Sequence, residues 1–290
     1  PQTELNTPAS RRKFGMKSRH RVMPRSFGLY RLAGHEFVAI ESEEVLFESL
    51  TLPFDDYIRC RELDLTVEVL HNGRIYEELQ SYCETVGLSW FDFILRFYEN
   101  RRNYGADICK MYDDFREGLT CRLWETREEL VNITINNIDE MLRDERGTNE
   151  MSMGKATGFL LLFEQINNTL FNEMKSWLAE LNLLDKEAEI YLEDVRRFSH
   201  LRKADVMNCD IEYLESFNFD IQALVESHFT LTPAQVKLTS PKQFKIAHLP
   251  EQNKRITSHV KEFGRLHDGM GKMLMRYPHV HRIFRCPQLA

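Results

Sequence analysis

Residues 53–73 read PFDDYIRCRELDLTVEVLHNG, and this stretch carries every local signal of an α-helix. Pro53 suits a first turn, where its missing N–H has no helical partner, and acidic Asp55 and Asp56 favour the positive end of the helix dipole. The pair Asn72-Gly73 supplies a stop. Larger side chains recur on one helical face, at Phe54, Tyr57, Ile58, Arg61, Leu65 and Val69. The segment predicts a helix packed by one side against its neighbours.

Helical periodicity continues from this segment to about residue 203. A helix capped by Ser89 carries Trp90, Phe91, Phe93, Ile94 and Phe97, whose spacing indicates core packing. Asp185 is placed to cap the last helix. We expect helices over 75–86, 89–97, about 106–118, 126–146, 151–181 with a break near Asn167-Asn168, and 185–203. Short connections favour antiparallel neighbours in a bundle.

The two ends of the chain have a different pattern. Residues 1–35 are rich in Pro, Gly and Arg and indicate an extended connector with one short helix, started by Thr7 and Pro8 and stopped by Gly15. From Glu36, alternation predicts two short strands or one interrupted strand. Beyond residue 205, 210–219 and 243–249 alternate like strands, and Pro250–Phe263 has helix signals ended by Gly264.

The fold class that follows is mainly α: a helical bundle with short N-terminal strands and a small C-terminal α/β unit. We expect three segments, 1–35, 36–205 and 206–290.

Composition indicates an ordinary globular chain, with 42% apolar and 29% charged residues among 290. No run approaches the roughly 20 apolar residues of a membrane helix, and no secretory signal opens the sequence. Six cysteines without a C-x-x-C pair indicate reduced thiols in the cytoplasm and no iron-sulfur or zinc site of the chain's own. Because the chain starts at Pro1 rather than methionine, we expect it to be part of a longer polypeptide.

Charge is unevenly distributed along the chain. Residues 1–31 hold 8 basic and 1 acidic side chains, residues 237–290 hold 11 and 3, and the remainder holds 19 and 41. Such basic ends suit either a phosphate-bearing partner or ion pairing with the acidic middle. We favour ion pairing, because no aromatic-interleaved strand, zinc finger or basic zipper accompanies the charge.

The opening PQTELNTPASRRKFGMKSRHRVMPRSFGLY (1–30) resembles a stretch near the end of the catalytic barrel in radical S-adenosylmethionine proteins with an N-terminal cobalamin-binding-type domain. In that family a PGTEL-like element precedes a basic stretch and an RVxPRxFG-like turn, here RVMPRSFG at 21–28. The similarity continues through TLPFDDY at 51–57 and covers about residues 1–104. The chain departs from the family at Gln2, where glycine is usual, and it contains no CxxxCxxC loop.

The resemblance implies a parent enzyme that uses a 4Fe-4S cluster and S-adenosylmethionine, with or without cobalamin, for radical methylation or rearrangement of a small molecule. It implies that this chain binds none of these cofactors alone and serves as the C-terminal, substrate-side region. Its partners would be the upstream barrel and the cobalamin-binding-type domain of the same polypeptide, without membrane or nucleic acid. The alternatives are a helical protein-interaction module without catalysis and, less favoured, a nucleic-acid-binding module.

Candidate site residues lie in the opening segment. In an extended chain Arg19 and Arg21, and with them Arg25, point to one side, which suits a phosphate or carboxylate group. Thr3 and Glu4 would line the barrel mouth if the resemblance holds. The alternative for the arginines is surface ion pairing, and for Thr3 and Glu4 a solvated loop or a cap. The C-terminal histidines, including His279 and His281, lack metal-ligand spacing, so no metal site is expected.

Overall fold

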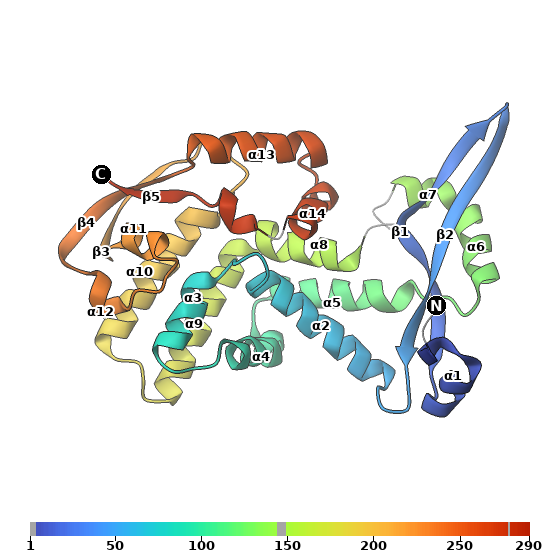
Figure 1. Ribbon diagram of the computed structural model, residues 1–290, viewed down its shortest axis with the longest axis horizontal. Helices are drawn as coiled ribbons and strands as arrows, with labels where there is room; N and C mark the ends of the chain where they lie inside the picture. The colour runs from blue at the N-terminus through green and yellow to red at the C-terminus, as the bar shows by residue number, and fades with distance from the viewer. Residues whose placement is uncertain (1–3, 144–148, 278) are drawn as a thin grey trace. The chain divides into compact units, whose positions relative to one another are not determined.

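The computed structural model describes residues 4–143, 149–277 and 279–290 (Figure 1). Fourteen α-helices and two small antiparallel sheets occur among these residues, which confirms the mainly α fold class. The chain forms two compact units. We call Pro1–Asp64 with Tyr112–Gly154 the hairpin unit, and Leu65–Met111 with Lys155–Ala290 the C-terminal unit. The segment boundaries expected at residues 35 and 205 remain predictions.

The hairpin unit opens with the expected capped helix. After a 3₁₀ turn, η1 (Glu4–Asn6), helix α1 spans Pro8–Phe14. Its cap residue Thr7 accepts a hydrogen bond from the Ser10 N–H through its hydroxyl at 3.2 Å. Gly15 ends the helix with φ of 57°, a left-handed conformation that glycine adopts without strain. Both boundary residues were predicted.

A long hairpin replaces the expected connector. Strand β1 (Lys17–Leu32) pairs with β2 (His35–Glu48) in an antiparallel ladder. Ala33 and Gly34 form the turn with φ of 50° and 80°, the positive values that a two-residue hairpin turn requires. The register shifts between Val22 and Phe27, around Pro24, which has no N–H to donate to a ladder. One continuous β2 stands where two short strands or an interrupted one were predicted.

One helix of the hairpin unit directly follows the hairpin in sequence, and four others come after a segment that belongs to the C-terminal unit. Helix α2 spans Phe54–Leu70, α5 Ala106–Cys121, α6 Arg127–Asn136, α7 Ile138–Arg143 and α8 Glu150–Ala156. The division between the two units falls inside α2, α5 and α8. Helix α6 lies along both β1 and β2. The buried Glu62 carboxylate on α2 is 3.2 Å from the guanidinium of Arg116 on α5.

The C-terminal unit contains α9 (Phe163–Glu180) and α10 (Lys186–Lys203), the two longest helices of the described residues. Helix α3 spans Glu77–Thr85 and α4 Trp90–Asn100, with a 3₁₀ turn η2 at Arg101–Asn103. Ser89 and Asp185 cap α4 and α10 through their side chains, as predicted. The break expected near Asn167 is wrong. It lies instead at a π-helical turn, Thr157–Leu161, while Asn167 is buried inside α9 and donates to the Arg196 carbonyl.

The end of the chain contains both strands and helices, as predicted. Strands β3 (Tyr213–Phe219), β4 (Lys237–Ala247) and β5 (Cys286–Leu289) make an antiparallel sheet in that order. Around it lie α11 (Ile221–Glu226), α12 (Pro233–Val236), α13 (Pro250–Phe263), α14 (His267–Arg276) and a 3₁₀ turn, η5 (Val280–Ile283). Of these, α11, α12, α14 and β5 had no sequence prediction.

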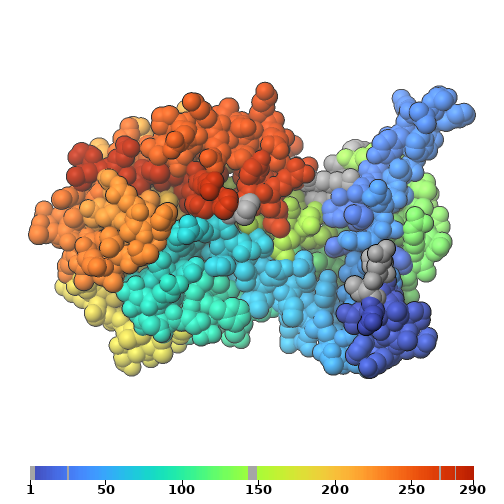
Figure 2. Space-filling model, viewed as in Figure 1, coloured from blue at the N-terminus to red at the C-terminus, as the bar shows by residue number. Residues whose placement is uncertain are grey.

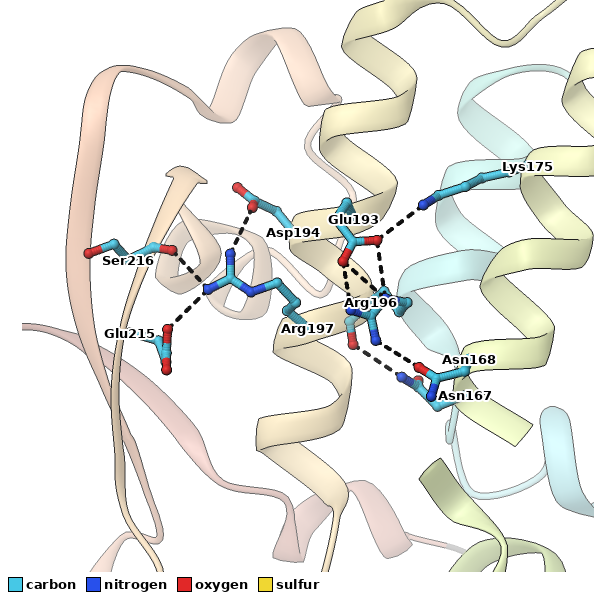
Figure 3. A network of polar contacts seen from close by, with 9 residues as sticks. All are labelled: Asn167, Asn168, Lys175, Glu193, Asp194, Arg196, Arg197, Glu215 and Ser216. Carbon is cyan, nitrogen blue, oxygen red and sulfur yellow. Dashed lines mark hydrogen bonds and ion pairs between the residues drawn. The ribbon is translucent and has the colours of Figure 1, made fainter. Parts of the chain in front are cut away.

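Polar side chains of α10 join this helix to its neighbours on two sides (Figure 3). Arg197 donates to the Glu215 carboxylate and the Ser216 carbonyl of β3, at 3.1 and 3.3 Å. On the other side Arg196 donates to Asn168 of α9 at 2.7 Å, and Glu193 pairs with Lys175. Helix α10 is therefore fixed between α9 and the sheet.

Aromatic side chains form much of the core in the C-terminal unit. Phe93 and Phe97 of α4 are at most 2% exposed and Trp90 is 9% exposed, so the predicted core packing is confirmed for these three residues. It is wrong for Phe91, which was predicted to pack with them but lies off that face and is 55% exposed. Within the described ranges no helix has the length and apolarity needed to cross a bilayer.

Candidate binding hollow in the hairpin unit

A hollow of about 620 Å³ lies in the hairpin unit, within the usual size range of small-molecule pockets. We call it the hairpin hollow. Its charged lining is Arg21, Asp114, Glu117, Arg122 and Glu150, and its other lining residues are Val22, Pro24, Gly118, Cys121, Trp124, Ile133, Asn137 and Met141. Strand β1, helices α5 to α8 and the loop before α6 all contribute. The hollow thus combines a charged part with an apolar part.

Two backbone features place β1 at this hollow. His20 and Trp124 exchange backbone hydrogen bonds of 2.8 Å in both directions, which holds the loop before α6 against the strand. Just beyond His20, Val22 still pairs with Ser42, the register shifts between Val22 and Phe27, and both Val22 and Pro24 line the hollow. The proline of the RVMPRSFG stretch therefore helps to shape the cavity wall.

The two guanidinium groups of the hollow are held by carboxylates. Arg21 Nε donates to Glu43 Oε1 of β2 at 2.5 Å, and Arg21 Nη1 lies 4.0 Å from Glu150 Oε2. Arg122 Nη1 donates to the other oxygen, Glu150 Oε1, at 3.0 Å. Glu150, with a side chain 13% exposed, therefore bridges two cations. This arrangement fixes both arginines without leaving either charge uncompensated.

Charge balance in the lining favours ligands that are not anionic. Asp114, Glu117 and Glu150 carry three formal negative charges against the two positive charges of Arg21 and Arg122. Trp124, Ile133 and Met141 supply an apolar wall, and the Cys121 thiol is free and exposed. The geometry suits a polar organic group, neutral or cationic, with an apolar part against the tryptophan side. No group of three metal-ligating side chains occurs in the part of the chain that the structure describes.

The other predicted site residues lie outside this lining. Arg19 is on the same face of β1 as Arg21, but its guanidinium lies 4.9 Å from the Phe47 ring centroid and 3.4 Å from Glu125. Glu4 begins the exposed turn η1, where its carbonyl accepts from the Thr7 hydroxyl at 3.0 Å. Thr3 lies outside the described residues, and for Arg25 the structure describes the backbone alone. Among the predicted site residues whose side chains the structure describes, Arg21 lines the hollow, whereas Glu4 and Arg19 do not.

Ion pairing with acidic residues, the favoured explanation of the basic N-terminus, is extensive. Basic side chains of α1 and β1 pair with acids of β2: Arg11 with Glu44, Lys17 with Glu48, Arg21 with Glu43 and Arg31 with Glu36. The Arg11 guanidinium and the Ser18 hydroxyl lower the pKa of Glu44 to about 2. The two strands thus carry complementary charge along their ladder.

Sequence reasoning missed Arg122, Trp124 and Glu150. The loop CRLWET (121–126) contains a tryptophan beside charged residues, which is the one local sign of a special position. Trp124 and Glu150 contact β1, about a hundred residues earlier in the chain, and Arg122 contacts Glu150. Spacing within one segment does not encode such contacts.

No protein-family model matches the chain, and no curated protein is significantly similar to it. The residues and their geometry therefore carry the functional argument.

Proposed function

We propose that this chain is the substrate-side region of a radical S-adenosylmethionine enzyme and that the hairpin hollow holds part of the substrate. The supporting sequence feature is the RVMPRSFG stretch at 21–28 with its flanking segments, which resembles that family. The supporting observation of geometry is that Arg21 of this stretch lines the hairpin hollow, beside Arg122 and Glu150. Enclosure of a substrate by such a region excludes water from a reactive radical.

Within this proposal Arg21 and Arg122 orient the substrate rather than react with it. Both guanidiniums are fixed by Glu43 or Glu150, so their remaining N–H groups point in set directions. A neutral polar group of the substrate would accept hydrogen bonds from these donors, and a cationic group would donate to the carboxylates of the lining. The apolar part of the substrate would pack on Trp124.

The cofactors of the proposed enzyme do not fit this chain's own cysteines. The six cysteines stand at 60, 83, 109, 121, 209 and 286, far from CxxxCxxC spacing, and each is an unpaired thiol. We therefore assign the 4Fe-4S cluster, S-adenosylmethionine and any cobalamin to upstream parts of the same polypeptide. Free thiols fit a reducing compartment, and we propose the cytoplasm as its location.

The test is anaerobic reconstitution of the full-length protein. Formation of 5'-deoxyadenosine from S-adenosylmethionine supports the proposal, and its absence with an intact cluster overturns the assignment to this family. Arg21→Gln should leave uncoupled cofactor cleavage unchanged but reduce its stimulation by a low-molecular-weight cell extract roughly tenfold, because a charge-assisted contact to substrate is lost. Arg31→Gln, which removes the exposed pair with Glu36 on the same strand, is the matched control.

The exposed side chains near the turn between β1 and β2, the hairpin tip, support a second candidate function, that of a protein-interaction module without catalysis. Tyr30, Leu32 and Phe37 are 52%, 69% and 47% exposed, and the rings of Tyr30 and Phe37 stack at 5.8 Å. Figure 2 shows the tip standing clear of the other atoms of its unit on this face. Such exposed apolar side chains on a sheet suit a protein partner. A stable complex that Leu32→Ser abolishes, together with failure to form 5'-deoxyadenosine, would favour this candidate.

A further inference from the structure

Helix α5 forms an acidic wall of the hairpin hollow. Asp114, Glu117, Gly118 and Cys121 of this helix all line the hollow. Residues three, four and seven positions apart lie on one face of a helix, so the two carboxylates stand on the same wall, one turn apart. Both Asp114 and Glu117 are exposed. A ligand in the hollow therefore meets negative charge along α5.

The positive charges of the hollow are already compensated. Arg21 pairs with Glu43, and Arg122 donates to Glu150 at 3.0 Å. Gly118 leaves room for Glu150 beside α5, because a Cβ at this position would lie 2.8 Å from the Glu150 Cγ. The lining holds three carboxylates, and Glu43 adds a fourth, against two guanidinium groups. An anion that enters the hollow would thus be repelled, and a cation attracted.

Glu117 is available to pair with such a cation. Its backbone carbonyl accepts from the Thr120 hydroxyl at 3.1 Å. No lysine or arginine in residues 4–143, 149–277 and 279–290 forms an ion pair with its side chain. A cation in the hollow can replace the water around this carboxylate and form a charge-assisted hydrogen bond with it. This bond gains more in a hollow partly closed to water than on an open surface.

Trp124, Ile133 and Met141 supply an apolar wall to the same hollow. The backbone of Trp124 is fixed by its two hydrogen bonds of 2.8 Å with His20. An indole ring attracts a cation through its π face and also packs against apolar groups. An unpaired carboxylate and an aromatic surface in one hollow are the two features that recognise an amine joined to an apolar group.

We propose that the hairpin hollow selects an organic cation, a protonated amine with an apolar substituent, and that Glu117 determines this selectivity. The inference rests on the proposed function of the hollow as a substrate site and names the class of that substrate. The ammonium group donates to the Glu117 carboxylate, and the apolar substituent packs against Trp124. Arg21 and Arg122 donate to neutral acceptor groups of the same molecule.

The experiment is an NMR titration of the 290-residue chain with three probes of similar size and different charge: benzylammonium, benzyl alcohol and benzoate. We expect benzylammonium to bind at least roughly tenfold more tightly than benzyl alcohol, because it pairs with a carboxylate, and benzoate to bind most weakly. Glu117→Gln should remove this preference and leave the affinity for benzyl alcohol unchanged. Glu128→Gln is the matched control, since it lies exposed on α6 outside the lining and changes the net charge equally.

Each outcome decides the proposal. Equal affinity for benzylammonium and benzyl alcohol, tightest binding of benzoate, or saturation by none of the probes overturns it. An unchanged preference in Glu117→Gln also overturns it, and so does an equal loss in Glu128→Gln, which would assign the preference to net charge. Failure of the proposed enzymatic function is read separately, because formation of 5'-deoxyadenosine requires the full-length protein and S-adenosylmethionine, whereas this titration requires neither.

Discussion

Replacing Glu78 by glutamine tests the electrostatics of the C-terminal unit directly. The side chain is 2% exposed and accepts from Lys203 and Ser199. Glutamine preserves its size and an acceptor oxygen but removes the negative charge that faces Lys203 and attracts Arg202. Breaking a buried pair from one side leaves a buried charge uncompensated and costs about 3–5 kcal/mol in general.

The structure divides this cost between the two cations. Burial lowers the pKa of Lys203 to about 8 in the wild type, despite the attraction of Glu78. At pH 7 Lys203 can release its proton for about 1.4 kcal/mol, so its share of the loss is limited to about that value. Arg202 cannot release its proton and accounts for the rest. We expect Glu78→Gln to lower the free energy of unfolding by about 3 kcal/mol at pH 7.

The pH dependence gives the sharper check. Because the folded-state pKa of Lys203 lies below that of an unfolded lysine, its charge opposes folding at neutral pH, and this cost is relieved as pH rises above about 8. At pH 9 Lys203 is already neutral in the wild type, so the loss caused by Glu78→Gln should shrink to about half. Urea unfolding at pH 7 and at pH 9 measures this loss in the free energy of unfolding.

The control is Glu84→Gln, at an exposed position on the same helix, and we expect its free energy of unfolding to lie within about 0.5 kcal/mol of wild type. A Glu78→Gln loss below about 0.5 kcal/mol, or one unchanged at pH 9, would refute this reasoning.

Two further perturbations follow from packing and burial. Gly158→Ala in the π-helical turn places a Cβ 2.8 Å from a methyl carbon of Val69, so we expect a loss of about 1–3 kcal/mol in urea unfolding. Gly105→Ala meets open space and should change stability by less than about 0.5 kcal/mol; equal losses in the two variants would contradict the packing argument. Burial lowers the pKa of His248 and His281 to about 4, so the unfolded chain binds protons that the folded chain does not between pH 6.5 and 4. Stability should therefore fall through this window as pH is lowered, by about 2 kcal/mol for each histidine, and the double variant His248→Gln, His281→Gln should show a shallower pH profile.

Helix boundaries were predictable because their causes are local. Thr7, Ser89 and Asp185 cap helices through their own side chains, within three residues of the N–H groups that they satisfy. The error at Asn167 has the opposite cause. An asparagine in a helix usually indicates a break, but this one is buried and bonded to the Arg196 carbonyl of α10, a contact that local sequence does not encode.

The hairpin was missed for a related reason. Arginine, proline and glycine in residues 17–32 hid the alternation of β1, because most of its side chains are only partly buried. Acidic side chains on β2, such as Glu43 opposite Arg21, stabilise β1 by ion pairing. Which acidic residue faces which basic residue is known only from the register of the two strands. Arg21 was identified from its spacing to Arg19, whereas Arg122 and Glu150 required the fold.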